Sequence, residues 1–265
     1  MKKLYILLFF ILGTISSFAQ WPFGKNPILN KEDWDKQRVH WGYYLGFNSM
    51  NYQISYTEDY HNQIHDLATK YPHDFTEIQV HSSTGFNVGL VGNLRLFEYL
   101  DLRFEPGLFH AKRTLTYPKV LIYNYYKQEH GNTLPKDQEI RNSSIKEVNS
   151  TYIHFPLLLK FSALRTGNIR PYLIGGVSMD LDLGSNSNSA KDNYEGVWRM
   201  KKWTANYEIG AGIDIYFHYF KFTPAIKGIF GLGDELIRDN SVNSPWTGGI
   251  KSMKKRGVFL SFTFH

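Results

Sequence analysis

Two histidines in the first half of the chain have the spacing of a metal site. His61 and His65 stand four positions apart, and Asp66 follows directly. On a helix this spacing would bring both imidazole rings to one metal ion. A zinc site needs a third protein ligand, and the sequence offers no convincing one. We therefore expect surface histidines here and no metal site.

The adjacent residues His81 and Ser82 carry the side chains of serine hydrolysis, the chemistry of lipid-modifying esterases. A serine nucleophile needs a base and an orienting acid at fixed positions. The sequence has no Gly-x-Ser-x-Gly turn and no other catalytic serine context. We expect no enzyme activity, no catalytic residue, no cofactor and no small-molecule substrate.

Ten charged side chains recur at alternate positions of otherwise apolar segments, where they could line an ion path or pair with one another. If these segments close into a barrel of eight strands, the interior is just wide enough for its own side chains. Buried charges are tolerated when they are paired. We therefore expect these charges to pair across a filled lumen that conducts nothing large. The set is Arg95, Asp101, Arg103, Glu105, His154, Lys160, Glu208, Asp214, Lys221 and Lys227.

The charges are positioned by about eight segments in which apolar and polar side chains alternate, the pattern of β-strands. Each segment is long enough for the ~9 to 11 residues of a tilted membrane strand. The polar faces are rich in Gly, Ser and Asn mixed with opposite charges, which suits a narrow lumen better than the outside of a soluble sandwich. The apolar faces carry Trp41, Tyr43, Leu45 and Phe47; Phe86, Val88, Leu90, Leu94 and Leu96; Leu100, Leu102, Phe104 and Leu108; Ile153, Phe155, Leu157, Leu159 and Phe161; Leu173, Val177, Met179 and Leu181; Tyr207, Ile209, Ala211, Ile213, Ile215 and Phe217; Phe220, Phe222, Ile226 and Phe230; and Val258, Leu260, Phe262 and Phe264.

The connections between these segments alternate between short and long, as expected of periplasmic turns and exterior loops. The short ones are residues 97–99, 163–168 and 218–219, and the long ones are residues 57–83, 118–144, 184–201 and 233–254. The sequence thus predicts an all-β fold, an eight-stranded antiparallel up-and-down transmembrane β-barrel with a filled lumen and long extracellular loops. Both termini would lie in the periplasm.

Pro106 and Pro156 fall in the middle of predicted strands, and each removes a donor from the hydrogen-bond ladder. Proline in a sheet is found chiefly at edges and bulges. We therefore expect a bulge at these positions, or a register shifted by one residue. The Tyr-rich stretch of residues 117–126, YPKVLIYNYY, is a candidate for an exposed interaction loop or for an aromatic girdle.

The N-terminus reads as a secretory signal peptide over residues 1–19, with Lys2 and Lys3, an apolar stretch over residues 4–12 and the cleavage site Ser17-Phe18-Ala19. A periplasmic lead-in over residues 20–38 and the barrel over residues 39–265 would follow as one domain. No later apolar run approaches the ~18 residues of a membrane helix. With 0 cysteines, the chain has no disulfide framework and no lipid-attachment cysteine.

The composition points to a lipid-facing surface. Aromatic residues make up 16% of the chain although the mean hydropathy is only -0.36, and rings gathered on a lipid-facing surface reconcile the two values. The net charge of +6 could favour anionic headgroups, but it is also common on ordinary surfaces. We expect outer-membrane lipid and lipopolysaccharide as partners, and no nucleic acid.

Residues 150–183, STYIHFPLLLKFSALRTGNIRPYLIGGVSMDLDL, resemble the outer-membrane β-barrel family of Bacteroidetes named after PorT. That family has an aromatic-x-x-Pro-leucine-rich strand followed by a turn and an Arg-Pro-Tyr-aliphatic-Gly-Gly strand. The stretches RVHWGYYLGFNSMNYQI, LDLRFEPGLFHAKRTL, YEIGAGIDIYFHYFKFTPAIKGIFGL and DELIRDN extend the resemblance over nearly the whole mature chain.

The resemblance implies a component of the type IX secretion system, which exports proteins with a conserved C-terminal domain and, in gliding species, surface adhesins. It carries over no catalytic residue, and it implies function through contacts with other secretion proteins. The narrow barrel would not itself be the conduit. The alternative is a stand-alone small barrel that acts as an adhesin or binds a ligand through its extracellular loops.

Overall fold

The computed structural model describes residues 29–60, 62, 64, 75–130, 137–241 and 244–265. The predicted signal peptide and the first part of the predicted lead-in lie outside these residues, as do His61, His65 and Asp66. Among the residues described, no helix combines the length and the hydropathy needed to cross a membrane.

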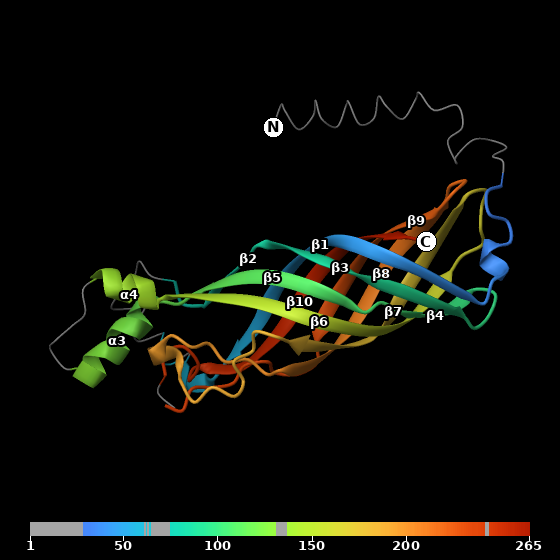
Figure 1. Ribbon diagram of the computed structural model, residues 1–265. Coiled ribbons are helices and arrows are strands. Elements are labelled where there is room, and N and C mark those ends of the chain that lie inside the picture. Colours follow the sequence, from blue (N-terminus) through green and yellow to red (C-terminus); the bar gives the residue numbers. More distant parts are fainter. Residues whose placement is uncertain (1–28, 61, 63, 65–74, 131–136, 242–243) are drawn as a thin grey trace, which may run out of the picture.

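One antiparallel sheet curls into a barrel, with the strands in sequence order around it (Figure 1). The first strand pairs on one side with the last and on the other with β3, so the sheet closes on itself. The strands are β1 (Val39–Tyr56), β2 (Gln79–Ser82), β3 (Thr84–Arg95), β4 (Leu100–Phe104), β5 (Gly107–Thr116), β6 (Ile145–Ser162), β7 (Ile169–Asp182), β8 (Trp203–Tyr216), β9 (Lys221–Gly231) and β10 (Ile250–Phe264).

These ten strands form eight crossing segments. Only Ser83 separates β2 from β3, and only Glu105 and Pro106 separate β4 from β5. Across the first break, β5 pairs with both β2 and β3. Across the second, β3 and β6 each pair with both β4 and β5. The predicted eight-stranded up-and-down barrel is therefore confirmed.

Pro106 and Pro156 lie at one interruption of the ladder, where Pro106 faces Phe155 and Pro156 faces Glu105. β6 pairs with β4 up to Leu157 and with β5 from His154, which leaves Phe155 and Pro156 beside Glu105 and Pro106. The register is the same on both sides, since Phe104 faces Leu157 and Gly107 faces His154. The predicted bulge or register shift is wrong, because the ladder that joins β6 to β4 and β5 is interrupted around the two prolines and resumes in the same register.

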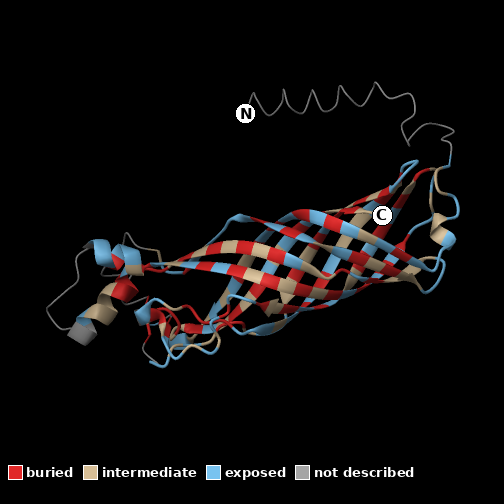
Figure 2. Cartoon of the chain, in the orientation of Figure 1, coloured by how far each residue is buried: buried red, intermediate tan, exposed pale blue. Residues whose placement is uncertain are grey.

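The predicted apolar faces point outward along all eight segments, and burial alternates residue by residue (Figure 2). In β8, Ile209 is 63% exposed while its neighbour Glu208 is 3% exposed. Side chains on the outer surface of a membrane barrel contact lipid. The outward band therefore identifies the part of the barrel that crosses the bilayer.

The polarity of the two faces reverses toward the end of the barrel that bears the long loops, here called the loop end. Beyond Phe47, the outward positions of β1 are Ser49, Asn51, Gln53 and Ser55. The inward positions there include the buried Met50 and Tyr52. The same reversal occurs in β5, β6 and β10. Nine further residues at about 3.3 Å each on tilted strands carry the barrel roughly 20 Å past the apolar band.

The connections follow the predicted alternation. Residues 96–99, 163–168 and 217–220 form short turns at the other end of the barrel, here called the turn end, and the long connections gather at the loop end. The helices α3 (Lys119–His130) and α4 (Asp137–Ser143) and the 3-10 helix η3 (Asn193–Glu195) belong to the loop end (Figure 1). The 3-10 helix η2 (Trp34–Lys36) precedes β1 at the turn end.

Candidate functional site: a filled lumen and its two closures

The lumen nearest the turn end is filled by a carboxylate shared between two lysines. Asp214 of β8 lies 2.6 Å from Nζ of Lys160 on β6 and 3.6 Å from Nζ of Lys221 on β9. The hydroxyl of Thr223 donates a hydrogen bond to the other oxygen of Asp214 at 2.8 Å. All four side chains are buried. The two lysines reach this carboxylate from different strands, so the contacts tie the wall together across the interior.

A second group occupies the middle of the lumen around Glu105. This carboxylate pairs with both Arg103 and Lys227. Arg103 also donates to the hydroxyl of Thr263 on β10 at 3.2 Å. Lys227 is 3.9 Å from Glu208, whose other oxygen is 2.9 Å from Nε2 of His154. Charges of opposite sign therefore alternate across the width of the barrel.

The third group lies toward the loop end around Asp180 of β7. Its two oxygens are each 2.5 Å from a nitrogen, one being Nδ1 of His154 and the other Nζ of Lys255 on β10. Lys255 also lies 3.3 Å from Glu235, which follows β9. Burial raises the pKa of Glu235 above its usual value, and the nearby Lys255 and Arg113 oppose that rise. The pairs thus continue from the turn end to the loop end.

The predicted pairing is confirmed for most of the charged set. Arg103, Glu105, His154, Lys160, Glu208, Asp214, Lys221 and Lys227 are buried and paired as described above. Arg95 and Asp101 are only half-buried, and neither forms an ion pair with another described residue. These two positions lie close to the short turn after β3, where water reaches them.

Sequence reasoning missed five buried charged residues that belong to this interior. Arg113 and Lys255 lie within predicted segments but were assigned to neither face, Glu235 falls in a predicted long loop, and Asp180 and Asp182 were placed on a polar face but not in the charged set. The first two lie where the strands run past the apolar band and the outward face becomes polar. Apolar and polar residues still alternate there, but the apolar ones point inward. This reversed pattern is the sequence signal that could have identified Arg113 and Lys255 as interior residues.

The segment before β1 folds across the turn end and closes it. Asp35 accepts a hydrogen bond from the hydroxyl of Tyr216 at 2.6 Å and lies 3.4 Å from Arg170 and 3.7 Å from Arg165. The amide of Asn30 donates to the side-chain oxygen of Asn168 at 2.8 Å. Trp34 stacks on His40 at 4.9 Å between ring centroids. The part of the lead-in that the structure describes is therefore bound to the barrel.

The loops pack into a cap with its own hydrophobic core at the loop end. Its largest buried side chains include Trp246, Trp198, Tyr117 and Ile122, packed on the inward residues of the projecting strands. The stretch 117–126 is a predicted exposed interaction loop or aromatic girdle, but Tyr117 and Ile122 are fully buried and Tyr125 packs at 5.8 Å against Trp246. Both alternatives are wrong, because these side chains belong to the core of the cap or pack against it.

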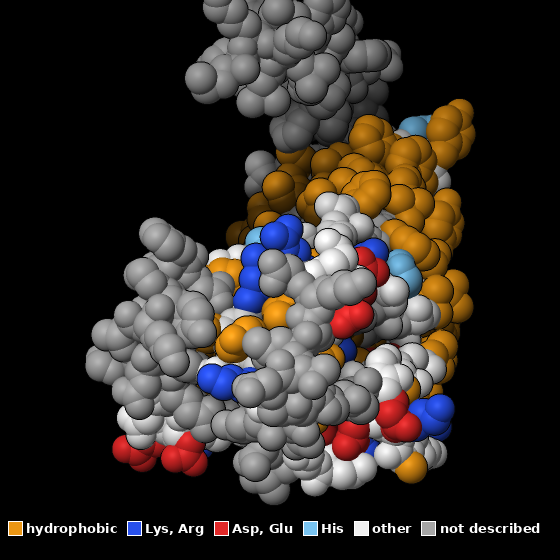
Figure 3. Space-filling model, turned by 90° about the vertical axis from the view of Figure 1, so that its left-hand side faces the viewer, with side chains coloured by type: hydrophobic (Ala, Val, Ile, Leu, Met, Phe, Trp, Pro, Cys, Tyr) orange, Lys and Arg blue, Asp and Glu red, His pale blue; other side chains and the backbone are white. Residues whose placement is uncertain are grey.

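Polar contacts join the third and fourth long loops within this cap. The side chain of Asn193 donates to Asp239 at 3.0 Å, and Arg199 donates to the carbonyl of Arg238 at 2.6 Å. Lys146 of β6 donates to the carbonyl of Asn193 at 3.1 Å. Seen from the loop end, the surface of the molecule carries acidic and basic side chains in front of the hydrophobic barrel wall (Figure 3). The cap thus offers a polar surface on a rigid support.

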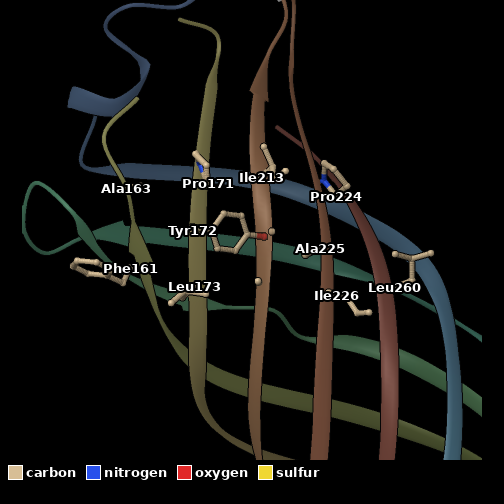
Figure 4. A pocket seen from close by; sticks show the side chains of 12 residues that line it. Phe161, Ala163, Pro171, Tyr172, Leu173, Ile213, Pro224, Ala225, Ile226 and Leu260 are labelled. Carbon is tan, nitrogen blue, oxygen red and sulfur yellow. The ribbon is translucent and has the colours of Figure 1, made fainter. Parts of the chain in front are cut away.

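A shallow apolar depression of about 620 Å³ lies in the outward wall near the turn end. Pro171, Ile213, Pro224 and Leu260 line it, and the ring of Tyr172 lies behind it (Figure 4). Pro224 is also where the pairing of β8 with β9 is interrupted. The depression opens on the lipid-facing side. Its lining is apolar, as contact with acyl chains requires.

The structure does not bring the side chains of His81 and Ser82 together. His81 and Ser82 are consecutive in β2, so their side chains point to opposite faces of the sheet. The hydroxyl of Ser82 is 3.1 Å from that of Ser49. No group of three or more His, Cys, Asp or Glu side chains within the described part of the chain could hold a metal ion.

Residues 18–236 match the sequence profile of the family described as "Outer membrane protein beta-barrel domain". One similar solved structure is Neisserial surface protein A, with 8% identity, 86% of this chain and 98% of that chain covered, and a TM-score of 0.41. Another is OprG from Pseudomonas aeruginosa, with 12% identity, 86% of this chain and 96% of that chain covered, and a TM-score of 0.42. A third is AlkL in DMPC lipid bilayers, with 12% identity, 91% and 94% covered and a TM-score of 0.39. No curated protein matches the sequence.

Proposed function

Because the chain belongs to the family of outer membrane protein beta-barrel domains, we propose that it is a structural component of the type IX secretion system and not its conduit. The barrel anchors the protein in the outer membrane, and its exposed ends contact other proteins of the assembly. This assignment to a secretion system is supported by the sequence resemblance over residues 150–183 to the PorT family.

The observation that carries the structural role is the chain of buried ion pairs along the lumen. Lys160–Asp214 at 2.6 Å, His154–Glu208 at 2.9 Å and Lys255–Asp180 at 2.5 Å hold side chains across the interior at successive heights. A polypeptide substrate could pass only if these pairs separated, and separating a buried charge from its partner is strongly unfavourable. The ends of the barrel, and not its interior, are therefore available for function.

We propose that the loop end faces the exterior and that both termini lie in the periplasm. Short turns on the periplasmic side and long loops outside are the rule for such barrels. Since the chain has 0 cysteines, single cysteines introduced as Ser241→Cys and Tyr219→Cys are unambiguous probes. A membrane-impermeant maleimide added to intact cells should label the first and not the second. The opposite result would reverse the orientation.

Deletion of the gene followed by mass spectrometry of the culture medium tests the secretion role. We expect proteins that carry the C-terminal export domain to disappear from the medium, and the full-length chain to restore them. An unchanged profile of secreted proteins would exclude the role. The same cysteine positions allow cross-linking in native membranes, which should join the chain to larger secretion proteins.

The cap of packed loops favours a second candidate function. Its helices and its polar outer surface are also what a stand-alone adhesin or ligand-binding barrel would present at the cell surface. Purification from native membranes in mild detergent separates the two. A stand-alone protein should migrate alone, whereas a component of the secretion system should migrate with its partners.

We propose that the protein is not an enzyme. Ser82 hydrogen-bonds to Ser49 rather than to a histidine, and His81 lies on the other face of β2. The variants His81→Ala and Ser82→Ala should leave the acyl chains of lipopolysaccharide unchanged. Loss of a measurable lipid modification in either variant would contradict this part of the proposal.

A further inference from the structure

Basic side chains cluster on the outward face of β10 directly past the end of the lipid-facing band. Val258 is the last apolar outward residue of this strand and is 51% exposed. Arg256 and Lys254 take the next two outward positions, and the exposed Lys251 follows. Lys255 between them points inward and is paired with Asp180. The alternation of the strand thus places Lys255 in the lumen and Lys254 and Arg256 outside, and Lys251 is exposed beside the irregularity in the register with β1.

Two further lysines lie on the same side of the barrel. Lys201 and Lys202 precede Trp203, which is 50% exposed at the start of β8. The segment after β9 joins them to β10, because the amide of Lys201 donates to the carbonyl of Glu235 at 2.8 Å and the amide of Glu235 donates to the carbonyl of Met253 at 2.9 Å. We call Lys201, Lys202, Lys251, Lys254 and Arg256 the basic border.

The charge of the basic border is not neutralised by neighbouring acids. Asp234 is bound to Arg238 at 2.9 Å and accepts the amide of Met253 at 2.8 Å. Glu235 is buried against Lys255. Within the described part of the chain, none of the five basic-border side chains forms an ion pair. The border therefore carries an excess of positive charge at the level of the membrane surface.

The described outward residues of β1 and β5 carry no unpaired charge at the same level. The outward residues of β1 there are Ser49 and Asn51, which face the β10 positions Val258 and Arg256. In β5 the corresponding basic residue, Lys112, pairs with Glu147 at 2.9 Å. Attraction of the whole barrel to an anionic surface would not require the positive charge to lie on one side. A ligand bound at one place on the barrel wall would require it.

We propose that the basic border binds the phosphate groups of a phosphorylated glycolipid in the leaflet that borders the loop end. The acyl chains of such a lipid would lie on the apolar faces of β8, β9 and β10, and its phosphates would lie beside Lys254 and Arg256. Trp203 is placed at the same level, where aromatic side chains of barrels meet the headgroups. The identification of that leaflet as the outer one, and of the lipid as lipopolysaccharide, rests on the orientation proposed above.

The test uses the purified full-length chain in non-ionic detergent, with bisphosphorylated lipid A as the probe. Lipid binding is measured by native mass spectrometry against the same lipid freed of its phosphates. The variant Lys251→Gln/Lys254→Gln/Arg256→Gln removes three charges from the border. The control Lys112→Gln/Lys119→Gln/Lys127→Gln removes three charges elsewhere at the loop end. Heat-dependent migration on gels shows that each barrel is folded.

We expect the phosphorylated lipid to bind the natural chain and the control alike, and the border variant roughly ten- to hundredfold more weakly. Equal loss in the control, or equal binding of the lipid without phosphates, would overturn the proposal. Competition by millimolar inorganic phosphate would show a site for free anions instead of a lipid. If the triple variant does not fold, the single variants Lys254→Gln and Arg256→Gln should each weaken binding, and unchanged binding in both would refute the site. The measurement in detergent depends neither on orientation nor on secretion, so its failure and that of the proposed function remain distinguishable.

Discussion

The Nζ atom of Lys255 on β10 lies 2.5 Å from a carboxylate oxygen of Asp180 on β7. Two strands of the sheet, β8 and β9, separate these residues along the wall, so the ion pair spans the interior. Both side chains are 2% exposed or less. The pair therefore links two strands that are not neighbours in the sheet, and it stabilises the closed barrel and not the pairing of two adjacent strands.

Replacing Asp180 should be severely destabilising, because it leaves Lys255 buried without its nearest partner. We expect Asp180→Ala to lower the free energy of unfolding by about 3–5 kcal/mol, measured by urea unfolding in detergent micelles. The double variant Asp180→Leu/Lys255→Met removes both charges and should recover only part of the loss, because His154 and Glu235 then lose these partners. A single variant as stable as the natural chain would mean that the pair does not form.

A charged side chain on the outward face should lower the folding stability when it lies inside the apolar band, and should change the stability little when it lies beyond the band. We expect Ile209→Arg in the middle of β8 to cost about 2–4 kcal/mol of folding free energy in lipid. The matched variant Asn51→Arg lies on the outward face of β1 beyond the band and should change the stability little. Similar effects at the two positions would show that the assigned edge of the band is misplaced.

Removing the carboxylate of Glu235 should make the protein less sensitive to rising pH. Burial raises the pKa of Glu235, so the carboxyl ionises at lower pH in the unfolded chain than in the folded chain. The natural protein therefore loses stability as the pH rises from about 4.3, the usual glutamate value, through the raised folded pKa. Urea unfolding at pH 4 and pH 8 should show Glu235→Gln gaining relative to the natural chain only at the higher pH.

The control for this prediction is Glu98→Gln, since Glu98 is exposed in a short turn. It should follow the natural chain at both pH values. A Glu235→Gln variant that is less stable at pH 8 would show that the attraction to Lys255 outweighs the cost of burial.

Loss of Asp35 should release the N-terminal segment from the turn end without unfolding the barrel. Asp35 is held by Tyr216 at 2.6 Å and by Arg170 at 3.4 Å. We expect trypsin to cut Asp35→Ala severalfold faster after Lys31 or Lys36, with N-terminal sequencing as the readout. Glu32→Ala, at an exposed neighbouring position, should be cut at the natural rate, and equal rates for the two variants would contradict the closure.

The filled lumen should exclude solutes the size of sugars. Liposomes that contain the natural chain should swell in an oligosaccharide solution no faster than empty liposomes. The Asp35→Ala variant should behave in the same way, because the ion pairs around Asp214, Glu105 and Asp180 remain. Rapid swelling with the natural chain would show an open path that the side chains do not block.

The amino-acid pattern was enough to predict the number of crossing segments, which faces point outward and the order of short and long connections. The reason is that, within each strand, the polarity of a side chain reflects whether it faces lipid or the lumen. Residues such as Ile209 and Glu208 differ in polarity because their successive side chains point to lipid and to the lumen. The pairing of charged side chains inside the barrel could also be predicted, because the lumen of an eight-stranded barrel has room only for its own side chains.

Which charged side chains meet, and how the two ends of the barrel close, depends on packing in three dimensions. His154, Asp180 and Lys255 come from three strands, and their contact depends on the stagger of the whole barrel. The positions of Arg113 and Lys255 were missed because the apolar face turns from outside to inside where the strands leave the membrane band. The folding of Asp35 over the turn end and of Tyr117 into the cap likewise depends on packing between distant segments, which no local pattern encodes.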